Sequence, residues 1–156
     1  KKVRNNKMND VLKENIVEYA GFWKRVAAAL IDSLVMLIPS MILGGIIGFV
    51  MAINDPYVTD YELEIVVNIV SIVTWWLYNS VFESSNFMGT PGKMALGIVV
   101  TDYQNQKISF AQASGRHFGK IISGIIIGIG FLMAAFTEKK QGLHDIMSGT
   151  LIVNKK

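Results

Sequence analysis

Long stretches without charged side chains are the strongest constraint on how this chain folds. Residues 26–53 contain one charged side chain, Asp32, and residues 65–82 contain none. A helix needs about 20 mainly apolar residues to cross a bilayer, with a range of roughly 17–25. The apolar part of a cleaved signal sequence is shorter, about 7–15 residues. The two runs therefore predict two membrane-spanning helices that are retained in the protein.

The composition agrees with a membrane protein and argues against three other classes. Charged residues make up 17% of the 156 residues, whereas an ordinary soluble domain has about 25%. The chain is too apolar for intrinsic disorder, and it has no cysteine from which to build a disulfide framework. A net charge of +3 is small for a nucleic-acid-binding protein, so the lipid bilayer is the expected partner and nucleic acid is not.

The distribution of lysine and arginine predicts the topology, because these residues are concentrated on the cytoplasmic side of membrane proteins. The N-terminal arm, residues 1–18, and the segment 83–120 are both net basic. The loop 54–64 between the two expected spans contains no lysine or arginine. We therefore expect the N-terminus in the cytoplasm and this loop on the outer side.

A third apolar segment, residues 117–137, leaves the topology of the C-terminal part open. If this segment were a single span, it would place the four C-terminal lysines on the outer side, against their usual distribution. A re-entrant hairpin that breaks near Gly124–Gly130 would keep them in the cytoplasm, which is the location we expect for the C-terminus. An ordinary third helix is the alternative. The lysines concerned are Lys139, Lys140, Lys155 and Lys156.

Shorter patterns predict surface elements on both sides of this segment. The β-branched run Ile98–Thr101 and the polar residues after it predict a short cytoplasmic β-hairpin over residues 96–109. Ser109 precedes an amphipathic pattern and is the expected N-cap of a helix. Residues 142–150 are expected to form an amphipathic C-terminal segment. The predicted fold is a mainly α, small membrane bundle of two full spans and a third apolar segment, with one short hairpin.

Asp32 is the candidate functional residue, because an acidic side chain at the centre of a membrane helix costs about 2.5–3.5 kcal/mol. Arg25 lies two helical turns earlier on nearly the same face, and Asp145 could pair with Arg25 if the C-terminal part is cytoplasmic. We take Arg25, Asp32 and Asp145 as a candidate polar cluster, which either binds an ion or links helices structurally. Candidate supporting residues are Asn79, Glu83, Lys93, Arg116 and His144.

Motifs for enzymatic chemistry are missing from the sequence. The segment Gly89–Met94 resembles part of a phosphate-binding loop, but it lacks the required spacing and the Ser or Thr after the lysine. Two histidines without cysteine give no zinc pattern. We therefore expect neither an enzyme nor a metal or cofactor site.

The segment Tyr19-Ala-Gly-Phe-Trp-Lys-Arg25-Val-Ala-Ala-Ala-Leu-Ile-Asp32 resembles the opening of the RDD family of small bacterial membrane proteins. That family is named for one Arg and two Asp residues, which match Arg25, Asp32 and Asp145. The resemblance extends over residues 19–153. Asn105 departs from the glycine that members often have in the hairpin turn, although Asn tolerates the same backbone region. Further matching positions are Thr90–Lys93, Gly97, Val99, Val100, Asp102, Ser109, Arg116, Gly149 and Thr150.

The resemblance implies the bacterial cytoplasmic (inner) membrane and several candidate functions. One is transport of a small monovalent cation coupled to protons, in which Asp32 would bind the ion within a homo-oligomer. The alternative is a non-catalytic accessory or regulatory subunit of a larger membrane protein, in which the cluster is a structural lock. A third interpretation is binding of anionic lipid at a basic rim. That rim would consist of Lys93, Arg116, Lys120, Lys139 and Lys140.

Overall fold

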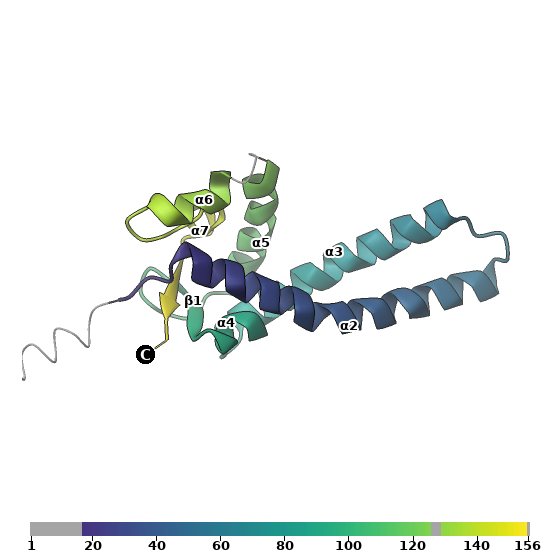
Figure 1. Ribbon diagram of the computed structural model, residues 1–156, viewed down its shortest axis with the longest axis horizontal. Coiled ribbons are helices and arrows are strands. Elements are labelled where there is room, and N and C mark those ends of the chain that lie inside the picture. Colours follow the sequence, from purple (N-terminus) through teal and green to yellow (C-terminus); the bar gives the residue numbers. More distant parts are fainter. Residues whose placement is uncertain (1–16, 126–128, 156) are drawn as a thin grey trace, which may run out of the picture.

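The computed structural model describes residues 17–125 and 129–155. Nearly all of the basic arm predicted at residues 1–18 lies outside these ranges, as do residues 126–128 of the predicted third apolar segment. The described chain is elongated, with two long helices at one end and the remaining elements gathered at the other (Figure 1).

The two long helices are α2 (Phe22–Asn54) and α3 (Asp60–Ser84), which run antiparallel as a hairpin (Figure 1). Both are long and apolar enough to cross a membrane, which confirms the two predicted apolar helices. Helix α3 begins with a capping box: Glu62 N donates to Thr59 Oγ1, and Thr59 N donates to Glu62 Oε2. This cap satisfies two backbone groups that the first helical turn leaves without partners.

The third apolar segment falls on the C-terminal half of α5 (Phe110–Ile125) and on α6 (Ile129–Phe136), and the angle between these two helices is 103°. The segment is therefore not one straight helix. A broken span and a re-entrant loop, which the sequence left open, are both consistent with this bend. A Cβ atom on Gly130 would lie 2.7 Å from the Cβ of Ser123, so only glycine allows α6 to approach α5 this closely.

A two-stranded antiparallel sheet joins distant parts of the sequence. Strand β1 (Ile98–Asp102) pairs with β2 (Thr150–Asn154), not with the residues that follow it. The predicted hairpin at residues 96–109 is therefore wrong in its pairing and is reduced to a turn with one bridge, between Thr101 and Lys107. The reason is that the helix begins too early: Gln112 N donates to Ser109 Oγ, which confirms Ser109 as the N-cap and leaves no room for a second strand.

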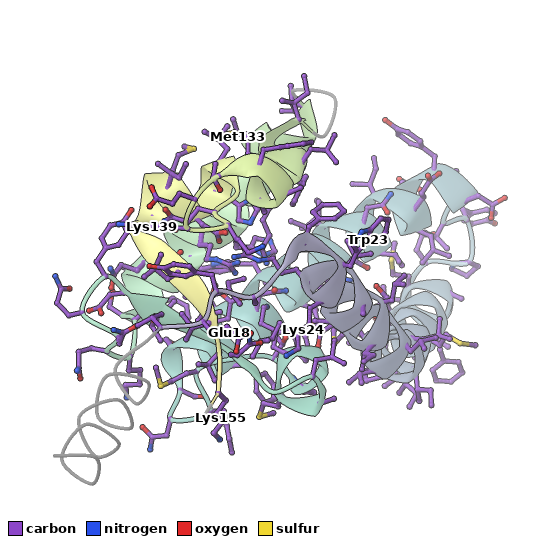
Figure 2. All side chains as sticks on the ribbon, turned by 60° about the vertical axis from the view of Figure 1, so that its left-hand side comes forward. Glu18, Trp23, Lys24, Met133, Lys139 and Lys155 are labelled. Atoms are coloured by element: carbon purple, nitrogen blue, oxygen red, sulfur yellow. The ribbon has the colours of Figure 1, made fainter. Side chains whose placement is uncertain are left out.

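We call the part formed by residues 85–155 the headpiece. It contains β1, β2, α5, α6 and two short helices, α4 (Pro91–Ala95) and α7 (Leu143–Ser148). The chain entering α2 joins it, because Ala20 N donates to Ile152 O and Asn154 N donates to Glu18 O. Trp23 lies on the long-helix side of the headpiece and Lys139 on the opposite side (Figure 2). The apolar core consists of Ala20, Ala28, Ile98, Val100, Ile108, Ala113 and Ile152.

Candidate functional site

A buried ion pair connects the start of α2 to α7. Arg25 Nη1 lies 2.5 Å from Asp145 Oδ2, which confirms the predicted pairing of these two residues. Asp145 is fully buried and also accepts hydrogen bonds from Arg116 Nε at 2.8 Å and from Gly142 N at 3.0 Å. One carboxylate thus connects α2, α5 and the N-terminus of α7. Charge-assisted bonds of this kind are about twice as strong as neutral ones.

Arg116 extends the ion pair into a network across five helices, α2, α3, α4, α5 and α7. Its Nη1 atom lies 2.8 Å from Glu83 Oε1, at the end of α3. The same oxygen accepts a hydrogen bond from Lys93 Nζ of α4, also at 2.8 Å. Arg116 and Glu83 are 2% and 1% exposed, so water does not replace these contacts. The network therefore depends on each charge having its partner, because an isolated buried charge is very costly.

Asp32 is bound separately from this network. Its carboxylate accepts hydrogen bonds from three uncharged donors: Tyr78 Oη at 2.8 Å, Thr90 Oγ1 at 2.6 Å and Gly92 N at 2.7 Å. It contacts neither Arg25 nor Asp145, so the expectation that these two are its partners is wrong. The physical reason is the position of α4, whose N-terminal backbone N–H and N-cap hydroxyl occupy the carboxylate first.

Gly92 makes the contact between α2 and α4 possible. A Cβ atom at this position would lie 2.2 Å from Ala28 O and 2.8 Å from Asp32 Cγ. The motif Thr90-Pro-Gly-Lys93 therefore has a structural explanation for each residue type. Thr90 donates to Asp32, Pro91 begins the helix, Gly92 allows the close approach and Lys93 reaches Glu83.

The electrostatic state of α7 follows from the same burial. Burial, reinforced by the positive charge of Arg116, lowers the pKa of His144 to about 3, so His144 is neutral at physiological pH. Burial alone would raise the pKa of Asp145, but the positive charges of Arg116 and Arg25 hold that pKa well below its ordinary value. The His144–Asp145 pair, 3.4 Å apart, is therefore a neutral imidazole beside a carboxylate.

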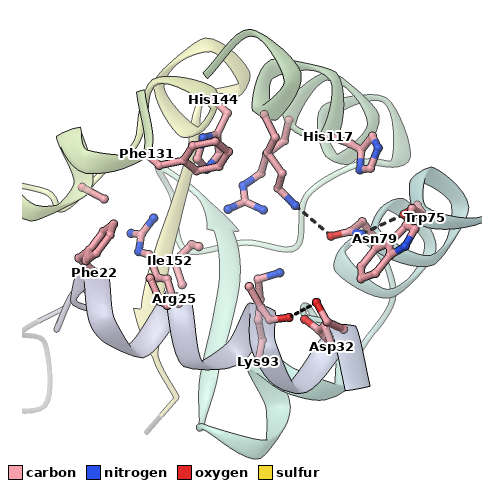
Figure 3. A pocket seen from close by; sticks show the side chains of 16 residues that line it. Phe22, Arg25, Asp32, Trp75, Asn79, Lys93, His117, Phe131, His144 and Ile152 are labelled. Carbon is pink, nitrogen blue, oxygen red and sulfur yellow. Dashed lines mark hydrogen bonds between the residues drawn. The ribbon is translucent and has the colours of Figure 1, made fainter. Parts of the chain in front are cut away.

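Most of the candidate site residues surround one partly open cavity of about 430 Å³ (Figure 3). Arg25 and Asp32 lie at separate points of its wall, although both belong to α2 (Figure 3). Glu83 and Asp145 lie behind the wall as partners of the lining cations. Among the residues that the structure describes, no three His, Asp or Glu side chains gather as metal ligands. The predicted residues on the wall are Arg25, Asp32, Asn79, Lys93, Arg116 and His144.

Sequence reasoning missed the partners of Asp32 and underestimated Lys120. Tyr78 is not among the candidate residues named above, although its hydroxyl donates to Asp32. Lys120 was assigned to a basic rim, whereas its Nζ atom lies at the cavity and donates to Asn79 Oδ1 at 2.9 Å. The four-residue spacing between Arg116 and Lys120 was the available signal, since it places both cations on one face of a helix.

Comparison with known proteins gives consistent results. The model of the RDD family matches residues 19–149. The uncharacterized protein YxaI of Bacillus subtilis is 39% identical over 87% of this chain and 97% of its own length. The uncharacterized membrane protein YteJ of the same organism is 30% identical over 88% of this chain and 82% of its own length. No solved structure matches the chain.

Proposed function

The chain belongs to the RDD family of membrane proteins, and on this premise we propose that it is a non-catalytic accessory or regulatory subunit of a larger membrane protein. In this proposal the buried network is a structural lock that fixes the headpiece to the two long helices. One observation carries it: protein donors already occupy the signature carboxylates. Asp145 is bound by Arg25, Arg116 and Gly142 N, and Asp32 by its three uncharged donors.

The occupied carboxylates favour a lock over an ion carrier. A transported cation would have to displace a guanidinium from Asp145, or lie beside Asp32 among groups that are already its hydrogen-bond donors. Breaking one partner out of a buried ion pair costs roughly 3–5 kcal/mol. A rigid headpiece of this kind presents a fixed surface beside the membrane, which is what a binding or regulatory subunit needs.

Proton-coupled transport of a small monovalent cation is the second candidate. The observation that favours it is that Asp32 lines the same cavity as Asn79, His117 and His144. A carboxylate and two imidazoles beside one cavity are groups from which a proton pathway could be built. Because one chain has few helices with which to enclose a transport pathway, transport would require a homo-oligomer.

One experiment separates the two candidates. The purified protein and its Asp32→Asn variant are reconstituted in proteoliposomes, and Na⁺, K⁺ and H⁺ flux is measured alongside the thermal unfolding temperature. The lock predicts no flux from either protein and a lower unfolding temperature for the variant. Asp55→Asn, in the exposed loop between the long helices, is the control and should unfold like the parent. Coupled flux that disappears in a normally stable Asp32→Asn variant would establish transport instead.

We also propose that both ends of the described chain face the cytoplasm, in the cytoplasmic membrane of a bacterium. The backbone pairing of Glu18 and Ala20 with β2 supports a common side for the two ends. The absence of lysine and arginine from residues 54–64 supports an outer location for that loop. Because the chain has no cysteine, a membrane-impermeant maleimide can test this in intact cells. Val58→Cys should react, and Asn105→Cys should react only after permeabilisation; the reverse pattern would refute the topology.

A further inference from the structure

The cavity described above has an unusual balance of charge. Four cationic side chains line it, and the network behind them supplies two carboxylates, Glu83 and Asp145. The third carboxylate, Asp32, also lines the cavity but is saturated by uncharged donors. The lining cations are Arg25, Lys93, Arg116 and Lys120.

Lys120 is the cation that the network satisfies least. Its nearest carboxylate oxygen among the described residues is Glu83 Oε1 at 3.9 Å, and that oxygen is already shared by Lys93 and Arg116 at 2.8 Å. Its one hydrogen bond goes to a neutral amide, Asn79 Oδ1. Two further donors or acceptors on lining residues, Arg25 Nη2 and His117 Nδ1, are buried without a hydrogen-bond partner in the described structure. Buried polar atoms are normally satisfied, so these two atoms are available to a ligand that enters the cavity.

Apolar side chains also line the cavity, together with polar residues such as Ser33, Asn79 and His117. The aromatic side chains lie at two ends of the cavity, with Phe22 and Phe131 at one end and Trp75 at the other (Figure 3). A volume of about 430 Å³ is within the usual range for small-molecule sites, roughly 300–1,000 Å³. The apolar lining residues are Phe22, Val26, Ala29, Trp75, Phe131, Ala134 and Ile152.

The position of the cavity along the long helices also matters. None of residues 37–78 is buried by the protein, and we call this part of α2 and α3 the distal hairpin. Its helical segments, 37–54 and 60–78, are about 27 Å and about 28.5 Å long at a rise of 1.5 Å per residue. That length matches the hydrocarbon core of a bilayer, about 30 Å. The cavity lies next to the proximal end of this hairpin, at the level where lipid headgroups would be.

We propose that this cavity binds a phosphate group, carried by a membrane lipid or free in solution. Phosphate oxygens accept hydrogen bonds from arginine and lysine together, and a negative charge would compensate the excess cation at Lys120. The apolar lining residues would accommodate the glycerol and first methylene groups of a lipid. This inference goes beyond the proposed function, since the network could lock the headpiece whether or not the cavity is filled.

Native mass spectrometry of the purified protein in a neutral detergent tests the proposal. Phosphatidylglycerol is titrated against monoglucosyldiacylglycerol, a neutral lipid without phosphate, and inorganic phosphate is titrated separately with the unfolding temperature as the readout. We expect one saturable phosphatidylglycerol per chain and weaker binding of the glycolipid. Lys120→Gln should weaken phosphatidylglycerol binding about tenfold, the effect of losing one charge-assisted hydrogen bond. Lys120→Arg, which keeps the charge, should restore it.

Lys107→Gln is the matched control. Lys107 is exposed, lies outside the cavity lining and, like Lys120, donates to one asparagine side chain, Asn86 Oδ1. The affinity of the Lys107→Gln variant for phosphatidylglycerol should lie within twofold of that of the parent protein.

Without lipid, the Lys120→Gln variant should unfold at the same temperature as the parent protein or at a higher one, because the substitution removes an excess cation. Binding of inorganic phosphate alone would support the site with a soluble ligand. Equal binding of both lipids with no phosphate effect, or unchanged phosphatidylglycerol binding by Lys120→Gln, would overturn the proposal.

Discussion

The headpiece and the distal hairpin are built on opposite principles. None of residues 37–78 is buried, and large apolar side chains such as Leu37, Phe49 and Ile72 are more than half exposed. In the headpiece, by contrast, Arg116, Glu83 and Asp145 are among the most deeply buried side chains of the described structure, with Glu83 contributed by the end of α3. The apolar side chains of the distal hairpin therefore face outward, whereas several charged side chains of the headpiece and of the end of α3 face inward.

This difference indicates the surroundings to which each region is suited. Lipid is as apolar as leucine, so the distal hairpin gains little from burying its side chains in protein. The arrangement of the headpiece instead depends on buried charged side chains, each of which must lie next to its own partners. The two regions should therefore respond differently to substitution. Changes to buried charges should unfold the headpiece, whereas changes in the distal hairpin should act locally.

The largest effect is expected from Arg116→Met, which leaves Glu83 and Asp145 with one shared cation fewer. Removing one partner of a buried ion pair typically costs about 3–5 kcal/mol, so thermal unfolding in detergent should occur at a much lower temperature. Adding Glu83→Gln to Arg116→Met should lower the unfolding temperature further, because Lys93 then also loses its carboxylate partner. If Arg116→Met shifts the unfolding temperature no more than Lys107→Gln does, the headpiece is not stabilised by its network.

Gly92→Ala should have the next largest effect, through sterics rather than charge. The new Cβ atom would lie 2.2 Å from Ala28 O, so α4 must move away from α2 and weaken the bonds to Asp32. Overpacking of this kind costs roughly 1–3 kcal/mol. Gly115→Ala is the matched control, since nothing lies within 4 Å of its Cβ position. That variant should be neutral or stabilising by up to about 1 kcal/mol, because alanine favours a helix over glycine. Equal losses in both variants would contradict a specific contact at Gly92.

The contrast between the two regions also explains what the sequence could predict. Uncharged runs are a local signal, and they located α2 and α3 correctly. Ser109 is likewise a local signal and was correct as an N-cap. The pairing of β1 with β2 depends on residues about 50 positions apart, which no local pattern specifies. The segment Thr150–Val153, in which three of the four residues are β-branched, was nevertheless available as a sign of a second strand.

The part of the candidate site that consists of pairs of opposite charges could be predicted from the sequence. Arg25 and Asp145 were identified as partners because an interfacial arginine needs a carboxylate. The partners of Asp32 are a hydroxyl, a phenol and a backbone N–H, and such uncharged donors occur throughout any sequence. Their convergence depends on how α4 packs against α2, so no local pattern identifies these donors.

A pH titration probes the electrostatics of α7 without changing the sequence. The pKa of His144 is about 3 in the folded protein and 6.5 for an ordinary histidine. Between these values the unfolded state binds a proton that the folded state does not, so stability is fully present above pH 6.5 and falls as the pH decreases. The slope for one group is at most about 1.4 kcal/mol per pH unit. His144→Gln should flatten the decrease in unfolding temperature between pH 6.5 and 4.5, and an unchanged slope would assign the effect to other groups.

The smallest expected effect compares two equivalent helix caps in the two regions. Thr59 caps α3 in the distal hairpin and Ser109 caps α5 in the headpiece, each through a reciprocal pair of hydrogen bonds. Replacing either by alanine removes about 1 kcal/mol of helix stability. Because Ser109 begins a helix that carries Arg116, Ser109→Ala should lower the global unfolding temperature.

Thr59→Ala should leave that temperature nearly unchanged, because α3 begins at the end of the hairpin that is farthest from the headpiece (Figure 1). Its effect should appear instead as faster hydrogen exchange of the amides of residues 60–63, which open locally. An equal drop of the global unfolding temperature in both variants would mean that the two regions unfold as one cooperative unit. In that case the hairpin would depend on the network as strongly as the headpiece does, despite burying none of its own side chains.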